Sequence, residues 1–262
     1  MMYDFHDLNI NRKIEAEPLP IEALNYGGHW LDREIDGYMT LSTSGRNEFS
    51  RQINSADRVD DGAVYLSSRI ESKKITVTFQ LLASTIEQYN ERFKKLKQLL
   101  LQPNQPFYFA DLQQYHFVGT ASALTLDSET LNTTGKIELS LADPYLHGNA
   151  KTITGSGTQI KINDSELAYP QTPTKLTFTP TKAVANLAIT CAGKKISLSV
   201  GVDAEQAVVV DFDNLNLSIN AVDNLMGLTL DSNLSDFYIT NGSTISINAA
   251  GNYKLEYEVK QL

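Results

Sequence analysis

Apolar and polar residues alternate with a period of two in this chain, and that pattern limits the folds open to it. In the second half, short alternating runs are separated by Asn, Asp, Gly and Ser. The runs are Ile160/Ile162, Leu176/Phe178, Ile196/Leu198/Val200, Leu217/Ile219, Ile245/Ile247 and Leu255/Tyr257/Val259. Successive side chains of a strand point to opposite faces, so each run is typical of a strand with one buried face. Many short strands at this spacing predict an antiparallel β-sandwich.

The first half contains one strong helical pattern. Ser84 followed by Glu87 fits a capping box, and Pro103 follows the last apolar position. Apolar residues recur at steps of three and four between these limits, at Ile86, Tyr89, Phe93, Leu96 and Leu100. The pattern predicts a helix over residues 84–101 whose apolar stripe packs on a sheet.

Strands flank this helix in the sequence. Residues 74–82 alternate, with Ile75, Val77, Phe79 and Leu81 on one face. Residues 107–109 and 116–118 indicate a hairpin, and Ile137, Leu139 and Leu141 alternate in a further strand. The order strand, helix, strand, strand, strand predicts an α+β unit, so the whole chain is expected to be mainly β.

Composition separates the two halves. All seven arginines lie at or before Arg92, Trp30 is the single tryptophan, and Asn, Ser and Thr are abundant in the second half. A strand-like run ends at Asp143–Gly148 in Pro and Gly, which favour a turn. We therefore expect domains at 1–148 and 149–262, with Gly155-Ser156-Gly157 forming a turn in a polar linker.

Charge and cysteine content disfavour several classes of protein. The formal charge of −9 opposes binding to nucleic acid, which gains from Lys and Arg contacts with phosphates. The single cysteine, Cys191, allows no intrachain disulfide, and its apolar neighbours indicate a buried side chain. The opening residues MMYDFHDLNI lack the pattern of a signal peptide, and no apolar run is long enough for a membrane helix. We expect synthesis in a cytoplasm.

Residue patterns for catalysis or metal binding are not found in the sequence. His6, His29, His116 and His147 are far apart, and no GxSxG or GxxxxGK[ST] motif is present. Asp57, Asp60 and Asp61 are interleaved with Arg58 and followed by Gly62, which favours a solvated turn. We expect a non-enzymatic protein without metal or cofactor. A carbohydrate-binding β-sandwich involved in host-surface recognition and a hydrolase with unrecognised carboxylates remain alternatives.

The segment 45–62 alternates like a strand but has too few apolar residues for a core. It is interpreted as an exposed hairpin arm, with a long mobile loop as the alternative. Exposed strand edges can pair with another chain. The candidate residues for an interface with another chain are Arg46, Phe49, Arg51, Ile53 and Val59.

Taken in order, these features resemble the distal tail protein family of siphophages, which forms phage tail-tip or baseplate hubs. The resemblance covers nearly the whole chain. It rests on Gly45-Arg46, the turn 61–65, the strand 74–82, the helix 84–100, Pro106–Asp111, Tyr115, Leu141–Tyr145, Phe237–Ile239, Asn241–Ser243 and Tyr257–Val259.

The family implies an N-terminal domain that assembles into a hexameric ring and a C-terminal galectin-like β-sandwich. It implies a structural virion protein at the tail tip, connecting the tail tube to the host-adsorption apparatus. The expected partners are further copies of the chain, the tail tube protein, and fibre or baseplate proteins. DNA would pass through the central channel without specific binding, and no membrane insertion is implied.

Overall fold

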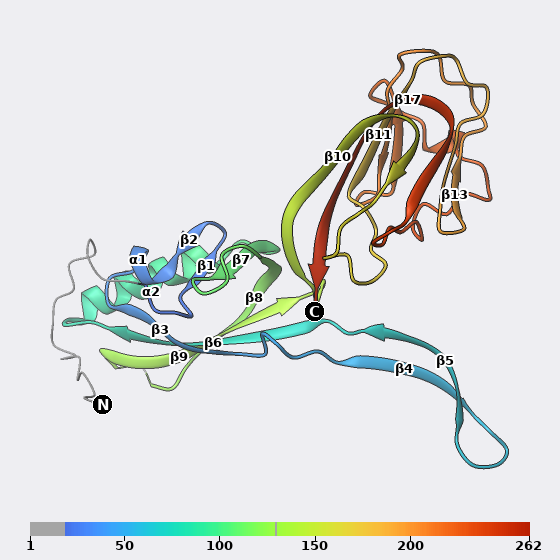
Figure 1. Cartoon of the computed structure of the whole chain (residues 1–262). Helices are drawn as coiled ribbons and strands as arrows, with labels where there is room; N and C mark the ends of the chain where they lie inside the picture. The colour runs from blue at the N-terminus through green and yellow to red at the C-terminus, as the bar shows by residue number, and fades with distance from the viewer. Residues whose placement is uncertain (1–18, 129) are drawn as a thin grey trace. The chain divides into compact units, whose positions relative to one another are not determined.

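A computed structural model describes residues 19–128 and 130–262 (Figure 1). These residues form two compact units, with unit 1 extending to Leu146 and unit 2 comprising His147–Gln261. The opening decapeptide and His6 lie outside the described residues. None of the helices within the described ranges is long and apolar enough to span a membrane.

Unit 1 is built on an antiparallel seven-stranded sheet in the order β2-β1-β7-β8-β9-β6-β3. The elements are β1 Leu24–Tyr26, β2 His29–Trp30, α1 Leu31–Glu34, β3 Tyr38–Ser44, β6 Lys73–Leu82, α2 Ile86–Leu100, β7 Gln105–Phe109, β8 Phe117–Leu126 and β9 Asn132–Leu141. The predicted order from β6 to β9 is confirmed. The elements β1 to β3 and α1 were not predicted.

Apolar and polar residues alternate along the strands of unit 1, so its core forms on the apolar face of the sheet. In β6, Ile75, Val77, Phe79 and Leu81 are completely buried, and the intervening residues are more exposed. The hairpin of β7 and β8 pairs Phe107 with Phe117 across the strands, as the sequence predicts.

Helix α2 begins one step later than its sequence motif suggested. Its N-cap is Thr85, whose hydroxyl accepts a hydrogen bond from the backbone N–H of Gln88 at 3.3 Å. The Gln88 side chain accepts in turn from the N–H of Ser84 at 3.1 Å. Thr85 and Gln88 thus cap the helix in place of Ser84 and Glu87, because their side chains accept from the backbone N–H groups of Gln88 and Ser84.

The buried face of α2 also differs in part from the prediction. Tyr89, Leu96 and Leu100 are buried, whereas Phe93 is half-buried and Ile86 is 55% exposed. Ile86 is the first residue of the helix. Its assignment to the apolar face was wrong.

Replacing Leu96 with Ala should destabilise unit 1 by about 2 to 5 kcal/mol, because its fully buried side chain would leave a cavity. Ile86→Ala on the same helix is the matched control and should change stability little. Chemical unfolding followed by tryptophan fluorescence measures both. Equal effects of the two substitutions would show that the buried face is misassigned.

Unit 2 contains an eight-stranded sheet in the order β13-β12-β17-β11-β14-β15-β16, with β10 paired to β17. Its elements are β10 Leu146–Lys161, β11 Lys175–Pro180, β12 Ala188–Cys191, β13 Lys194–Ser197, β14 Val208–Asp211, β15 Asn216–Ile219, β16 Val222–Asp223, η1 Leu225–Gly227 and β17 Thr244–Gln261. Phe178, Phe237 and Leu255 are among the completely buried residues of its own core. The mainly β fold class, with an α+β unit followed by an antiparallel sandwich, is confirmed.

Two glycines explain where strands in unit 2 run longer than predicted. A Cβ at Gly155 would lie 2.6 Å from the Tyr253 hydroxyl, and a Cβ at Gly251 would lie 2.3 Å from the Thr179 carbonyl oxygen. These glycines allow close packing within continuous strands. The interpretation of Gly155–Gly157 as a linker turn was therefore wrong, and the runs at 245–247 and 255–259 belong to one strand, β17.

Candidate assembly interface

The segment between β3 and β6 forms a hairpin arm of two antiparallel strands, β4 Arg51–Asp57 and β5 Ala63–Ile70. They form a sheet of their own, apart from the seven-stranded sheet, and extend away from it within unit 1 (Figure 1). The hairpin interpretation is confirmed over that of a mobile loop. Its second strand lies beyond Gly62, where the sequence analysis ended the arm.

Polar pairs across the two strands hold the arm together. Arg69 Nε donates to Gln52 Oε1 at 2.7 Å, and Asn54 Nδ2 donates to Ser67 Oγ at 3.0 Å. At the tip, the N–H of Arg58 donates to the Gly62 carbonyl at 3.2 Å. These contacts define the register of the hairpin without any hydrophobic core.

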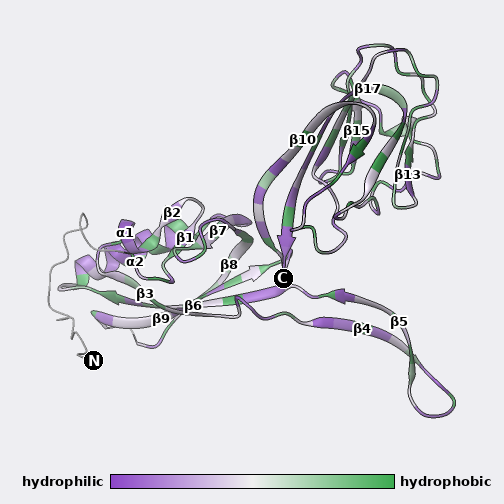
Figure 2. Ribbon diagram, in the orientation of Figure 1, coloured by the Kyte–Doolittle hydropathy of each residue, from purple (hydrophilic) through white to green (hydrophobic). Residues whose placement is uncertain are grey.

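Apolar side chains on the arm are left in solvent. Every residue of β4 is exposed, and Figure 2 shows hydrophilic and hydrophobic positions interspersed along the arm. Large apolar side chains that are 60% exposed or more are Phe49, Ile53, Val59, Tyr65 and Leu66. A two-stranded ribbon alone is marginally stable in water, and exposed apolar clusters mark interaction surfaces. The arm has the features of a segment that a partner covers.

One face of the arm combines apolar and basic groups. Ile53 lies opposite Ser68, and Ser55 lies opposite Tyr65 after a bulge in the register. Arg51 Nη1 donates to Ser68 Oγ at 3.1 Å and the Tyr65 hydroxyl donates to the same atom at 2.9 Å, so these side chains share a face. The sequence analysis missed Val64, Tyr65 and Leu66 as interface candidates, because a run of apolar residues without alternation does not indicate an exposed strand.

Arg46 differs from the other interface candidates because it lies at the root of the arm and packs within unit 1. Its guanidinium donates to both Asp111 carboxylate oxygens, at 2.8 and 3.0 Å, and lies 4.3 Å from the centre of the Phe109 ring. Its side chain is 13% exposed. Phe49, Arg51, Ile53 and Val59 remain candidate contact residues, whereas Arg46 fixes where the arm leaves the sheet.

Lys73 supports the same root from the other side. Its ammonium donates to the carbonyl of Arg46 and lies 5.3 Å from the centre of the Phe117 ring. Burial lowers the pKa of Lys73 from its ordinary value. With the lysine on β6 and the arginine just after β3, both strands of the arm are tied to the sheet at their point of exit.

The backbone conformation and the close packing at the root of the arm require glycine at position 45. Its φ is +85°, and a Cβ there would lie 2.3 Å from the Lys74 carbonyl oxygen. Gly62 at the tip has a φ of +86° with open space around it. A left-handed backbone conformation at a residue other than glycine reduces stability by roughly 1 to 2 kcal/mol.

Gly45→Ala should destabilise unit 1 by more than this conformational cost, because the clash is with backbone. Gly62→Ala, the matched control, should leave the unfolding of the core nearly unchanged. Urea unfolding measures both. A Gly45→Ala protein as stable as the Gly62→Ala protein would refute a rigid root.

The edge strands of the seven-stranded sheet are protected from pairing with another chain, whereas the strands of the arm are not. At the edge strand β3, the N–H of Thr40 donates to Asp32 Oδ1 and the N–H of Thr43 donates to Glu22 Oε2, each at 2.7 Å. The opposite edge, β2, is two residues long. Capped donors and short edge strands oppose pairing with another chain. Among the described residues of unit 1, the arm therefore offers the open strand edges.

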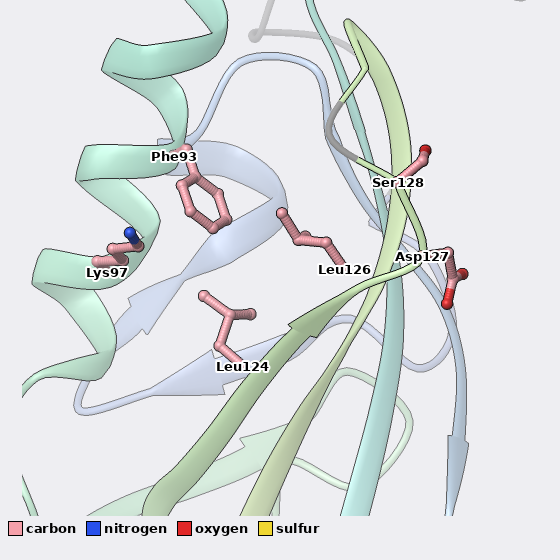
Figure 3. Close-up of a pocket in the computed structure, with 6 residues that line it drawn as sticks. All are labelled: Phe93, Lys97, Leu124, Leu126, Asp127 and Ser128. Atoms are coloured by element: carbon pink, nitrogen blue, oxygen red, sulfur yellow. The ribbon is translucent and has the colours of Figure 1, made fainter.

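A second surface feature of unit 1 is an open groove of roughly 560 Å³ between α2 and the end of β8. It is lined by Phe93, Lys97, Leu124, Leu126, Asp127 and Ser128. Figure 3 shows Phe93 on the helix and Leu124 and Leu126 on the strand pointing toward one another. Lys97 Nζ lies 4.4 Å from the centre of the Phe93 ring. The groove combines an apolar floor with one basic and one acidic residue.

The structure also shows the environment of the cysteine, aspartates and histidines that the sequence analysis considered. Cys191 is buried, as predicted, and burial raises the pKa of its thiol. Asp57, Asp60 and Asp61 are exposed at the tip of the arm, in agreement with a solvated turn. His29 Nδ1 lies 2.6 Å from Glu34, and His147 Nδ1 lies 3.2 Å from Glu258.

The aromatic side chains of unit 2 lie mainly in its core. Phe178, Phe212, Phe237 and Tyr257 are buried, and Tyr169, Tyr238 and Tyr253 are half-buried. A flat sugar-binding platform needs exposed rings. These seven side chains therefore do not form such a platform.

No family model matches the chain, and neither does any curated protein. Among solved structures, it is similar to SPP1 Dit (gp 19.1), described as a paradigm of the hub adsorption apparatus in phages that infect Gram-positive bacteria. The TM-score is 0.76 at 13% identity, over 91% of this chain and 99% of that chain. Chains of the phage P2 baseplate in its activated conformation, with Ca or Sr, align at a TM-score of 0.42 and 10% identity over 84% of this chain and 90% of theirs. The first likeness confirms the resemblance at the level of the fold, including a galectin-like domain.

Proposed function

We propose that this chain is a distal tail protein of a siphophage: a ring-forming hub that connects the tail tube to the host-adsorption apparatus and leaves a central channel for DNA. It acts as a structural component of the virion tail tip, made in the host cytoplasm, and not as an enzyme. The observation that carries the proposal is the shared fold with SPP1 Dit, which covers 99% of that hub protein.

The arm supports the assembly part of the proposal. Its open strand edges and exposed Phe49, Ile53, Val59 and Tyr65 provide a surface for another subunit, and Arg46 and Lys73 hold its root in place. A rigid root gives each copy the same projection angle. Repetition of one heterologous contact closes a ring when the rotation between subunits is a whole fraction of a turn.

The charge of the chain suits DNA passage. With 31 acidic and 22 basic residues, a ring of such chains carries excess negative charge. Phosphates are retained by Lys and Arg contacts, so an excess of acidic residues favours a channel that does not hold DNA. The second unit would lie outside this channel and dock fibre or baseplate proteins.

The carbohydrate-binding alternative receives no specific support from unit 2, whose aromatic side chains are buried or half-buried. The hub proposal accounts for the exposed arm, which a sugar-binding sandwich does not require.

The mass of the particle in solution tests the proposal. The chain is 29.1 kDa, and light scattering over a concentration series should approach about six times this mass. A monomeric mass up to the highest concentration, at an ionic strength near 0.15 M and also at lower salt, would contradict the ring.

A further inference from the structure

We infer that the tip of the arm of one subunit seats in the α2–β8 groove of the next copy of this chain. The inference deepens the proposed function and rests on it. It assigns a partner and a contact to two features of unit 1 that are unoccupied within a single chain. They are Val59, the one apolar side chain at the acidic tip of the arm, and the apolar groove beside α2.

The two surfaces match in hydrophobicity. Val59, at the tip, is fully exposed. The floor of the groove consists of Phe93, Leu124 and Leu126, each half-buried. Covering these four side chains against one another removes apolar area from water on both sides.

Charges on the two surfaces are complementary. The tip carries Asp57, Asp60 and Asp61 against one Arg58, so it is net acidic. On helix α2, Arg92 pairs with Asp36 and Lys95 donates to the Glu34 carbonyl, so Lys94 and Lys97 are the basic side chains left to meet the tip. Lys97 lies in the groove, and Lys94 is exposed on the same helix. Opposite charges beside an apolar contact fix its register.

Geometry excludes the same contact within one chain. Val59 lies nine residues from Ser50, which at about 3.3 Å per residue places the tip roughly 30 Å from the root. In the sheet, Leu126 lies opposite Gly135, which lies opposite Phe79. Phe79 is six residues along β6 from Lys73, so the groove lies roughly 20 Å from the root.

These two spans run in opposite directions from the root (Figure 1). The tip therefore reaches a groove on another copy and not its own. Because the tip and groove are different surfaces at opposite ends of unit 1, each subunit gives one contact and receives another. Such head-to-tail contacts generate rings when they close, in agreement with the proposed hub.

Charge reversal tests the pairing. Asp60→Lys and Lys97→Glu should each weaken self-association by roughly two- to fivefold, the range of one exposed ion pair. The double variant should recover most of this loss. Losses that simply multiply in the double variant would show that Asp60 and Lys97 are not coupled, and would overturn the assignment.

Cross-linking tests the contact directly. In a Cys191→Ala background, Val59→Cys combined with Leu126→Cys should yield, with a short bismaleimide, a ladder of multimers on a denaturing gel. Val59→Cys combined with Ile21→Cys is the matched control, because Ile21 is 77% exposed on unit 1 but does not line the groove. The control should give a weak ladder or none.

Light scattering on the untreated double-cysteine protein separates the outcomes. A ladder specific to the groove pair supports the inference, whether or not the rings are stable at that concentration. Ring-sized particles without a specific ladder overturn the groove assignment and leave the hub proposal standing. Monomers without a ladder overturn both.

Discussion

Removal of the arm will abolish ring formation while unit 1 stays folded. The structure defines the cut: the N–H of Glu71 donates to the Ser50 carbonyl at 3.0 Å, and the Ser50 hydroxyl donates to Glu71 Oε2 at 2.8 Å. Residues 51–70 can therefore be replaced by Asn-Gly, which closes a two-residue hairpin turn. Because the arm contributes no side chain to the core of unit 1, the melting temperature should change by only a few degrees.

A variant that keeps the arm provides the control for this deletion. Asn54→Ala removes one polar cross-strand contact and leaves the apolar face intact, so it should still assemble.

The double variant Ile53→Asn, Tyr65→Asn should weaken assembly without unfolding unit 1. Assembly of the arm-deleted protein at the wild-type mass would show that the interface lies elsewhere on unit 1.

Fragments 1–146 and 147–262 are expected to fold separately, with only the first forming rings. Each unit has its own buried cluster, centred on residues such as Phe79 and Phe107 in unit 1 and Phe178 and Phe237 in unit 2. The arm and the groove both belong to unit 1. Light scattering should give about six chain masses for the first fragment and one for the second.

The fragment experiment has a defined contrary result. If fragment 1–146 stays monomeric where the full chain assembles, unit 2 contributes to closure and the assignment of the ring to unit 1 is wrong. The cut is placed after Leu146, two residues before the predicted boundary at Gly148, because the two compact units divide there and His147 is buried in unit 2.

Local periodicity explains which elements could be predicted from the sequence. Strand β6 and helix α2 each bury one face, so their apolar spacing of two or of three and four is visible without a structure. Strands β1 and β2 have three and two residues, too few for a period to show. Ser84-x-x-Glu and Thr85-x-x-Gln are both capping motifs, and the sequence alone does not choose between them.

The candidate site was only partly predictable because its features depend on long-range contacts and on exposure. Arg46 and Asp111 are 65 residues apart, so the pairing that holds the arm's root leaves no local pattern. Strand β5 buries neither face, so Tyr65 and Leu66 show no alternation and the arm was ended too early at Gly62. The groove combines α2 with the end of β8, and of its lining residues only Phe93 was singled out from the sequence.

Electron microscopy of the purified full-length chain is the most direct test of a ring-forming hub. At a concentration where light scattering reports about six chain masses, class averages should show closed rings of six subunits around an open bore. The bore should be wide enough for a DNA double helix to pass. Compact particles without a bore, or open filaments built by the same arm contact, would contradict the account.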